Sequence, residues 1–175
     1  MRFLVDAMLG TLARWLRVLG FDTYFARDLN DDDIVELANR ESMTLISRDR
    51  ALCERVPGSI HMAEVGLETQ LMSIISGHRP DRTLFLSRCL ECNGVLGQVE
   101  KFLVITQLPD SVRELHEEFW QCPGCKKVYW KGSHYCLTKL NARPLMAWMK
   151  AKGSKRDRSP HAVHICAFVI KAERL

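Results

Sequence analysis

Two Cys-x-x-Cys pairs, Cys89–Cys92 and Cys122–Cys125, have the spacing of metal ligands. Each pair supplies two thiolates from one tight turn, and two such turns complete a tetrahedral site with no open position, as in structural zinc sites. The stretch between the pairs is longer than the roughly 15–20 residues of the usual double-pair pattern. An inserted helix would account for the excess. The spacing therefore predicts a structural Zn²⁺ site.

Other interpretations of the cysteines are weaker. The chain has 7 cysteines, an odd number, whereas a secreted disulfide framework usually has an even one. A thioredoxin-like redox motif would need a strand-to-helix junction, which neither pair has. We interpret Cys53, Cys136 and Cys166 as buried or incidental thiols. A variant metal site that uses His134 or Cys136 stays open.

Three aspartates far apart in the sequence form a second group with potential chemistry. Asp6 ends the first predicted strand, Asp31 opens the helix after the second, and Asp49 follows the third. Because parallel strands end at one edge of a sheet, we expect these carboxylates to converge there. Clustered carboxylates repel each other and are suited to a hard divalent cation. Mg²⁺ or Mn²⁺ at this edge could support hydrolysis of a phosphodiester.

Each aspartate also has a simpler interpretation. Asp31 is a natural helix N-cap, and Asp49 lies between Arg48 and Arg50, where it could form a surface salt bridge. Asp6 is harder to explain without a function, because a charge at the end of an apolar strand is costly. A phosphoryl-accepting receiver domain also gathers acids at this edge, and that alternative stays open.

The first 80 or so residues alternate strand and helix patterns, which predicts a parallel sheet with helices on both faces. Strands are expected at 2–5, 23–25, 44–46 and 59–62, and helices at 9–19, from Asn30 or Asp31 onward, and at 66–76. The pattern changes near 77–80. Beyond it, β-like runs at 95–99, 102–105 and 128–130 surround the cysteine pairs, with a polar helix at 110–118.

We therefore divide the chain into an α/β domain at 1–80, a small zinc ribbon at 85–140, and a closing helix with a basic tail at 141–175. The composition is 47% hydrophobic and 26% charged, which is typical of a globular protein. No apolar run is long enough to cross a bilayer. Asp6, Arg14 and Arg17 interrupt the signal-like N-terminal stretch, and we expect a cytoplasmic protein with no membrane partner.

A net charge of +4 permits a polyanionic partner without requiring one. The predicted RNA contacts are phosphate-binding side chains and rings that could stack on bases, namely Arg14, Arg17, Ser47, Arg48, Trp130 and His134. The alternatives are an ordinary solvated helix face for the arginines and packing of the small zinc module for the aromatic residues. We favour packing for Trp120.

Short motifs occur in a fixed order along the chain: FLVDAMLG (3–10), LARWLR (12–17), LGFD (19–22), ARD (26–28), LISRDR (45–50), SRCLECNG (87–94), EFWQCPGC (118–125) and VYWKGSH (128–134). Together they closely resemble the Mut-seven C-terminal RNase domain family, PIN-like nucleases with an attached zinc ribbon. The resemblance covers roughly residues 1–140 and has no counterpart for the tail after Lys150.

The resemblance implies a PIN-like three-layer α/β/α fold and a Mg²⁺- or Mn²⁺-dependent ribonuclease. It assigns Asp6 and Asp49 to the metal site and Asp31 to the helix-borne acid, a role that Asp32 or Asp33 could hold instead. Ser47 stands where the family usually has threonine, which keeps the hydroxyl. A fourth acid is expected, and Asp28 or Glu64 could supply it.

The sequence thus predicts a hydrolase in which a metal-bound water attacks the phosphorus of RNA. Asp6, Asp31 and Asp49 would hold the catalytic metal, and the ribbon would bind RNA, a ribosome-associated surface or an RNA-processing complex. The rival hypothesis is a non-catalytic RNA- or ribosome-binding adaptor in which the zinc ribbon is the working part.

Overall fold

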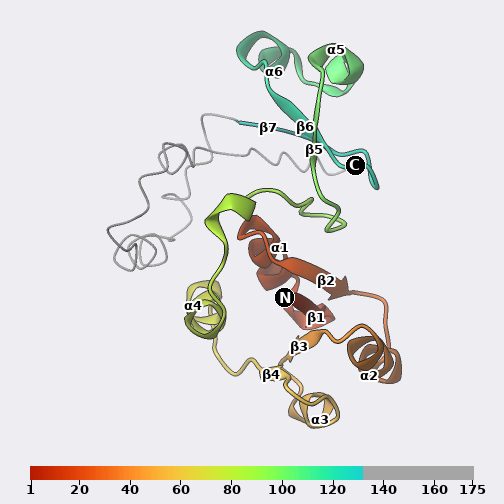
Figure 1. Cartoon of the computed structure of the whole chain (residues 1–175), viewed down its shortest axis with the longest axis vertical. Coiled ribbons are helices and arrows are strands. Elements are labelled where there is room, and N and C mark those ends of the chain that lie inside the picture. Colours follow the sequence, from red (N-terminus) through yellow and green to blue (C-terminus); the bar gives the residue numbers. More distant parts are fainter. Residues whose placement is uncertain (132–175) are drawn as a thin grey trace. The chain divides into compact units, whose positions relative to one another are not determined.

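A computed structural model describes residues 1–131 of the chain, apart from the side chain of Arg82. The chain forms two compact units, Met1–Asn93 and Gly94–Leu175 (Figure 1). The expectations for His134, Cys136, Cys166 and the closing helix and tail at 141–175 lie outside the described residues. Among the residues that are described, no helix is long and apolar enough to span a membrane.

The first unit is built on a four-stranded parallel sheet, as predicted. Its strands are β1 (Arg2–Asp6), β2 (Asp22–Ala26), β3 (Thr44–Ser47) and β4 (Ile60–His61), in the order β2-β1-β3-β4 (Figure 1). The two neighbours of β1 pair with it in parallel, and β3 pairs with β4 in the same way. The C-terminal ends of β1 and β3, which carry the predicted acids, therefore lie at the same edge.

Helices alternate with these strands. They are α1 (Gly10–Val18), which follows the short 3₁₀ helix η1 (Ala7–Leu9), α2 (Asp31–Arg40), α3 (Arg50–Glu54) and α4 (Leu67–Gly77). The N-cap of α2 is Asn30, whose side chain accepts a hydrogen bond from the backbone N–H of Asp33. The sequence pattern did not predict α3, because five residues are too few to show helical periodicity.

The two faces of the sheet are covered by different helices. On one face Leu4 and Leu45 belong to a buried apolar cluster with residues of α2, α3 and the adjoining loops. Successive side chains of a strand point to opposite faces, and Phe3 accordingly packs edge-to-face against Phe21 and His78, which follow α1 and α4. Truncating a fully buried leucine such as Leu4 to alanine would cost about 2–5 kcal/mol.

The second unit contains an antiparallel sheet of β5 (Gly97–Val99), β6 (Phe119–Gln121) and β7 (Val128–Trp130), in that order. Between β5 and β6 lie α5 (Lys101–Val104), the 3₁₀ helix η3 (Ile105–Gln107) and α6 (Asp110–Leu115). The helical insertion predicted between the cysteine pairs is thus present. The polar helix ends earlier than the expected residue 118.

The strand expected at 102–105 is wrong, because these residues form α5 and the start of η3. Their apolar composition resembles that of a buried strand, yet Phe102 is 69% exposed and only Val104 enters the core. That core consists of Val104, Leu108, Val112, Phe119 and Trp130. A continuous apolar run therefore did not signal a buried strand here.

Candidate metal centres

The carboxylate of Asp6 lies at the C-terminal end of β1, where a buried hydroxyl from the neighbouring strand β3 fixes it. Ser47 is fully buried, and its Oγ donates a hydrogen bond of 2.6 Å to Oδ2 of Asp6. The same Oγ accepts a hydrogen bond of 2.9 Å from the backbone N–H of Asp49. One hydroxyl thus links both predicted acids at the edge of the sheet.

Asp49 is also the N-cap of α3. Its Oδ1 accepts a hydrogen bond of 3.1 Å from the backbone N–H of Leu52, which holds the carboxylate at the start of the helix. The alternative of a surface salt bridge to a flanking arginine finds no support, because Arg50 pairs with Glu54 at 3.5 Å. Within residues 1–131, Asp49 forms no ion pair.

The acidic run at the start of α2 is divided among different partners. Asp32 forms an ion pair with Arg55, and Asp33 accepts a hydrogen bond of 2.8 Å from the side chain of Asn30. Asp31 is exposed, and in the described part of the chain its carboxylate forms neither an ion pair nor a hydrogen bond. This leaves Asp31, rather than its two neighbours, available as a ligand.

The structure brings Asp6, Ser47 and Asp49 together but does not join Asp31 to them by any hydrogen bond among residues 1–131. The proposed fourth acids are not joined to them either. Asp28 is exposed after β2, and the backbone carbonyl of Glu64 accepts a hydrogen bond from the buried side chain of Gln70.

His61 at the end of β4 is a residue of this edge that the sequence analysis missed. Its Nε2 lies 3.1 Å from the carbonyl oxygen of Arg48, in the loop that carries Asp49. Its strand position is opposite Ser47. The signal was available, since His61 ends the fourth predicted strand as Asp6 ends the first.

The four cysteines of the two Cys-x-x-Cys pairs form a complete ligand set. The sulfur atoms of Cys89, Cys92, Cys122 and Cys125 all lie within 4.8 Å of one another. Among the described residues, no other group of three or more His, Cys, Asp or Glu side chains comes together this closely. Four thiolates in this arrangement fit Zn²⁺, which binds soft sulfur donors in tetrahedral geometry.

The two cysteine turns have the same backbone geometry. The N–H of Asn93 donates to the carbonyl of Cys89 at 2.9 Å, and the N–H of Lys126 donates to the carbonyl of Cys122 at 3.0 Å. Both donors have positive φ, 68° for Asn93 and 62° for Lys126. Asparagine tolerates this left-handed region better than most residues, which accounts for its place after the first pair.

The family model of the Mut7-C RNAse domain matches residues 1–140. The chain belongs to the Mut7-C RNAse domain family. Membership confirms the resemblance seen in the sequence and indicates a nuclease function that acts on RNA. No curated protein and no solved structure is similar enough to this Mut7-C chain to count as a match.

Two of the RNA contacts predicted for the Mut7-C chain have other roles in the first unit, Met1–Asn93. Arg17 is only 4% exposed, and its guanidinium donates to the carbonyls of Thr23, Leu90 and Glu91. Burial lowers the pKa of Arg17, and the negative charges of nearby cysteines oppose that shift. Ser47 is buried against Asp6. Neither side chain is accessible to RNA, so both assignments are wrong.

Trp130 is a third prediction that the Mut7-C structure corrects. It is 8% exposed and belongs to the apolar core of the second unit, so its ring cannot stack on a base. The small ribbon needs this ring to build a core. Trp120 is half-buried, and Nζ of Lys131 lies 5.0 Å from the centroid of its ring.

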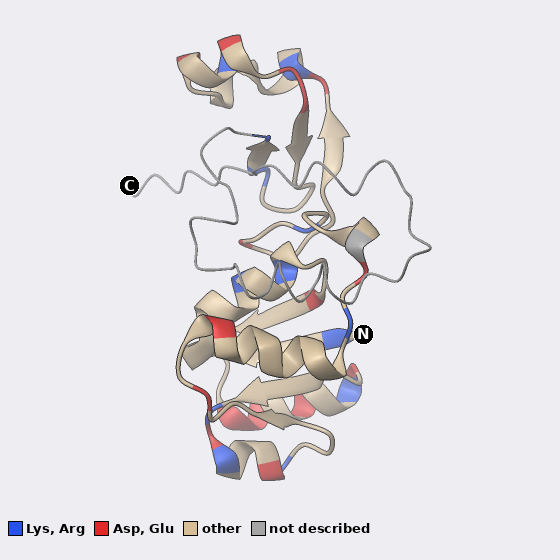
Figure 2. Ribbon diagram, turned by 90° about the vertical axis from the view of Figure 1, so that its left-hand side faces the viewer, with Lys and Arg blue, Asp and Glu red and all other residues tan. Residues whose placement is uncertain are grey.

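Arg14 and Arg48 remain compatible with RNA binding. Arg14 is exposed and forms an ion pair of 3.3 Å with Glu91, while Arg48 is exposed beside the acidic edge. Basic and acidic residues are interspersed throughout the described part of the chain (Figure 2), in keeping with a net charge of only +4. RNA binding would therefore depend on a few positioned cations rather than on a strongly basic surface.

Proposed function

We propose that this chain is a metal-dependent ribonuclease that hydrolyses RNA phosphodiester bonds at the sheet edge formed by Asp6 and Asp49. Family membership supports the RNase activity. The observation that supports this location is the pair of hydrogen bonds through which Ser47 links the Asp6 carboxylate to the backbone of Asp49. Two acids held at the ends of adjacent parallel strands are suited to a hard cation.

In this proposal Asp6, Asp31 and Asp49 hold Mg²⁺ or Mn²⁺, which when bound would supply Lewis-acid stabilisation and a more acidic water. Ser47 fixes Oδ2 of Asp6 and leaves Oδ1 for the cation. The cap on α3 occupies Oδ1 of Asp49 and leaves Oδ2. Exposed Arg48 would contact a phosphate of the substrate.

Four cysteinyl sulfurs support a second, structural metal. Cys89, Cys92, Cys122 and Cys125 would hold Zn²⁺ with no position left for substrate. We propose that the ribbon assists RNA binding, with Arg14 and His134 as further contacts. The reducing cytoplasm would keep these thiols available for the metal, which supports that location for the protein.

A cleavage assay on single-stranded and structured RNA tests the catalytic proposal. Zinc-loaded protein should cleave RNA only when Mg²⁺ or Mn²⁺ is added. Asp6→Asn should reduce the rate by at least about 100-fold, since even residues that merely support metal ligands contribute about 10–100-fold. Asp110→Asn is the matched control, because Asp110 lies in α6 and pairs with Arg113. Wild-type cleavage by Asp6→Asn would contradict the proposal.

An RNA- or ribosome-binding adaptor is the second candidate function. It is favoured by one observation: the cysteine ligands are fully assembled, whereas Asp31 is not bonded to the other two acids. An adaptor would retain RNA on a filter in a zinc-dependent manner, would not cleave it, and would bind no Mn²⁺ through Asp6. Isothermal titration of Mn²⁺ into wild type and Asp6→Asn distinguishes the two functions.

A further inference from the structure

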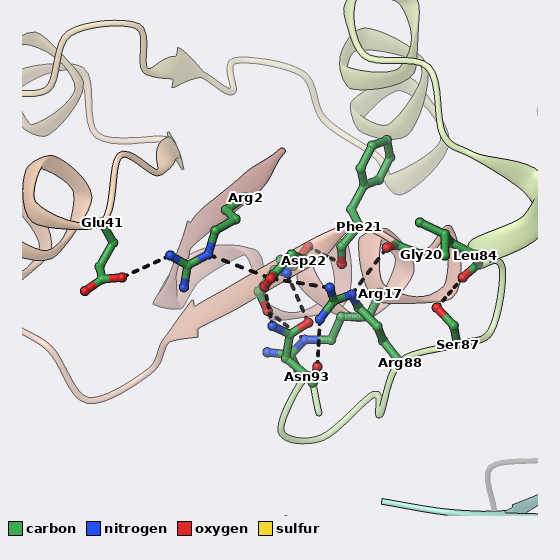
Figure 3. Close-up of polar contacts among 11 residues, drawn as sticks. Arg2, Arg17, Gly20, Phe21, Asp22, Glu41, Leu84, Ser87, Arg88 and Asn93 are labelled. Atoms are coloured by element: carbon green, nitrogen blue, oxygen red, sulfur yellow. Dashed lines mark hydrogen bonds and ion pairs between the residues drawn. The ribbon is translucent and has the colours of Figure 1, made fainter. Parts of the chain in front are cut away.

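A buried arginine contacts the first cysteine turn, Cys89–Cys92, within the first unit (Met1–Asn93), which we call the nuclease unit because it carries the proposed catalytic edge. Arg17 lies in the last turn of α1, and its Nη1 donates to the carbonyl oxygens of Leu90 at 2.7 Å and Glu91 at 3.0 Å. Its Nε donates to the carbonyl oxygen of Thr23 at 2.9 Å (Figure 3). The first two acceptors are the residues that separate Cys89 from Cys92, so one guanidinium ties the metal-binding turn to α1 and β2.

Asn93, which follows the turn, anchors it a second time. Its Oδ1 accepts a hydrogen bond of 3.0 Å from the backbone N–H of Thr23, and its Nδ2 donates to Asp22 at 2.7 Å. The two groups that Asn93 contacts belong to Thr23 and Asp22 at the start of β2, and Figure 3 shows the contact between Asn93 and Asp22. The left-handed residue that closes the turn is thus held by the edge strand of the nuclease sheet.

Arg88, which precedes the turn, anchors it a third time. Its guanidinium donates to the carbonyls of Gly20 at 3.3 Å and Asn93 at 3.1 Å, and it forms an ion pair of 3.3 Å with Asp22 (Figure 3). Residues on both sides of Cys89–Cys92 are therefore bonded to the region where α1 ends and β2 begins. The turn is fixed by the nuclease unit itself.

We propose that Arg17 is a positioning residue for zinc, which sets the Cys89–Cys92 turn from inside the nuclease unit. This inference rests on the proposed zinc site. Packing alone does not explain a buried arginine, because desolvating a guanidinium is costly unless its donors and charge are satisfied. Three carbonyls satisfy the donors, and once Cys89 and Cys92 are thiolates, as zinc ligands must be, their charge also favours the guanidinium.

The consequence is that zinc retention depends on the folded nuclease unit. A structural metal binds most tightly when its ligands are already oriented, and residues that orient ligands typically contribute about 10–100-fold to metal affinity. Without Arg17, the carbonyls of Leu90 and Glu91 lose their shared donor. The turn then has more conformations, and each of them presents the two thiolates less favourably.

Zinc release to a chromogenic chelator tests this role. Metal analysis of the purified wild-type chain comes first: if it contains no zinc, the zinc proposal itself fails, separately from any effect of Arg17. Arg17→Met should then speed zinc release about 10–100-fold. Arg17→Lys keeps the charge but cannot reach three carbonyls, and should fall between. Arg40→Met is the control and should release zinc at the wild-type rate, because Arg40 pairs with Glu36 on the exposed face of α2.

Cobalt substitution gives a readout that a merely structural arginine would not change. The sulfur-to-cobalt charge-transfer bands of Co²⁺-loaded Arg17→Met should shift relative to wild type, because the thiolates of the first turn are reoriented. Folded Arg17→Met with wild-type zinc release and an unchanged cobalt spectrum would overturn the proposal. If circular dichroism shows that Arg17→Met does not fold, Arg17→Lys replaces it in both measurements, and wild-type zinc release with an unchanged cobalt spectrum in that variant would overturn the proposal equally.

Discussion

The two candidate metal centres are assembled to different degrees. The four cysteine sulfurs lie within 4.8 Å of one another, so all four ligands of this set are in place. At the acidic edge, Asp6 and Asp49 are linked through Ser47, while Asp31 stays exposed at the start of α2. We call the cysteine site the closed centre, because its four ligands are all in place. We call the site of Asp6, Asp31 and Asp49 the acidic centre, in which only Asp6 and Asp49 are linked.

Physical chemistry accounts for the difference. Each cysteine turn is closed by its own backbone hydrogen bond, and the Cys-x-x-Cys spacing places two sulfurs on one tight turn. Carboxylates are charged at neutral pH and repel each other, so their approach depends on a cation. A structural zinc site and a catalytic Mg²⁺ or Mn²⁺ site are therefore expected to respond differently to the loss of one supporting group.

The largest effect should follow from breaking the closed centre. Cys89→Ser with Cys92→Ser removes half of the ligands, so the chain should lose its zinc entirely. Because structural zinc contributes roughly 10–16 kcal/mol in small zinc domains at neutral pH, β5–β7 should also lose ordered packing. Metal analysis and amide hydrogen exchange measure both effects.

The control for this pair is Cys53→Ser, because Cys53 is a buried thiol that lies against the carbonyl of Ser47 and outside the ligand set. It should keep wild-type zinc content even if it lowers stability. Retention of zinc by the double serine variant would show that the closed centre does not bind metal through these sulfurs.

The acidic centre should respond in a graded way. Ser47→Ala removes the hydroxyl that donates to Asp6 and accepts from the Asp49 backbone. We expect Mn²⁺ affinity and RNA cleavage to fall about 10–100-fold, as for other groups that orient metal ligands. Ser47→Thr keeps the hydroxyl and should retain most of both. Equal titration curves for Ser47→Ala and wild type would remove Ser47 from the site.

The parts of these centres that could be predicted from sequence are those fixed by local pattern. Asp6 and Asp49 were placed because each follows an apolar run, and parallel strands end at a common edge. The cysteine pairs were placed by their spacing alone. Both signals are contained in short windows of sequence, so neither depends on knowing which helix covers which face.

The remaining features depend on contacts between distant segments. Arg17 was interpreted as a surface cation because the sequence pattern of a helical arginine is the same whether its guanidinium donates to water or to buried carbonyls. Ser47 was recognised only by its place in the family motif, since the Asp6 partner is set by strand pairing. Trp130 was misassigned because an aromatic ring beside a knuckle can stack on a base or fill a core, and the small ribbon needed the core.

The contacts that hold the first cysteine turn can be tested at Gly20, whose carbonyl accepts a hydrogen bond from Arg88. Gly20 has φ +83°, and a Cβ there would clash with the backbone oxygen of Leu84. Gly58 has φ +76° with nothing within 4 Å of the same position. Gly20→Ala and Gly58→Ala therefore share a conformational cost of about 1–2 kcal/mol, and only Gly20→Ala adds a clash with backbone.

Urea unfolding of the zinc-loaded chain measures this difference. Gly20→Ala should lower the free energy of unfolding by about 2 kcal/mol more than Gly58→Ala does, since overpacking against a fixed group typically costs about 1–3 kcal/mol. It should also speed zinc release, because Gly20 is bonded to Arg88 beside the turn. Equal destabilisation by the two variants would mean that the Leu84 segment moves away without cost.

The smallest expected effect comes from Cys53, the buried thiol that donates to the carbonyl of Ser47 next to the acidic centre. Burial raises the pKa of Cys53 and outweighs hydrogen bonds with Ser59 and Ser47, which lower it, and the charges of Asp49 and Asp6 add a smaller increase. The folded state therefore binds the thiol proton more tightly than the unfolded chain does. The contribution to stability is complete below the unfolded pKa of about 8.5 and is lost as pH rises above it, by at most about 1.4 kcal/mol per pH unit.

Comparison of wild type with Cys53→Ala between about pH 7.5 and 9.5 isolates this contribution, because all other titrating groups are common to both. Wild type should lose unfolding free energy more steeply with pH, and identical slopes would contradict the shift. Mn²⁺ bound at Asp6 and Asp49 would offset their negative charge, so the difference in slope should shrink when Mn²⁺ is added. Zinc in the cysteine cluster should leave it unchanged, which makes Cys53 a reporter of one metal centre and not the other.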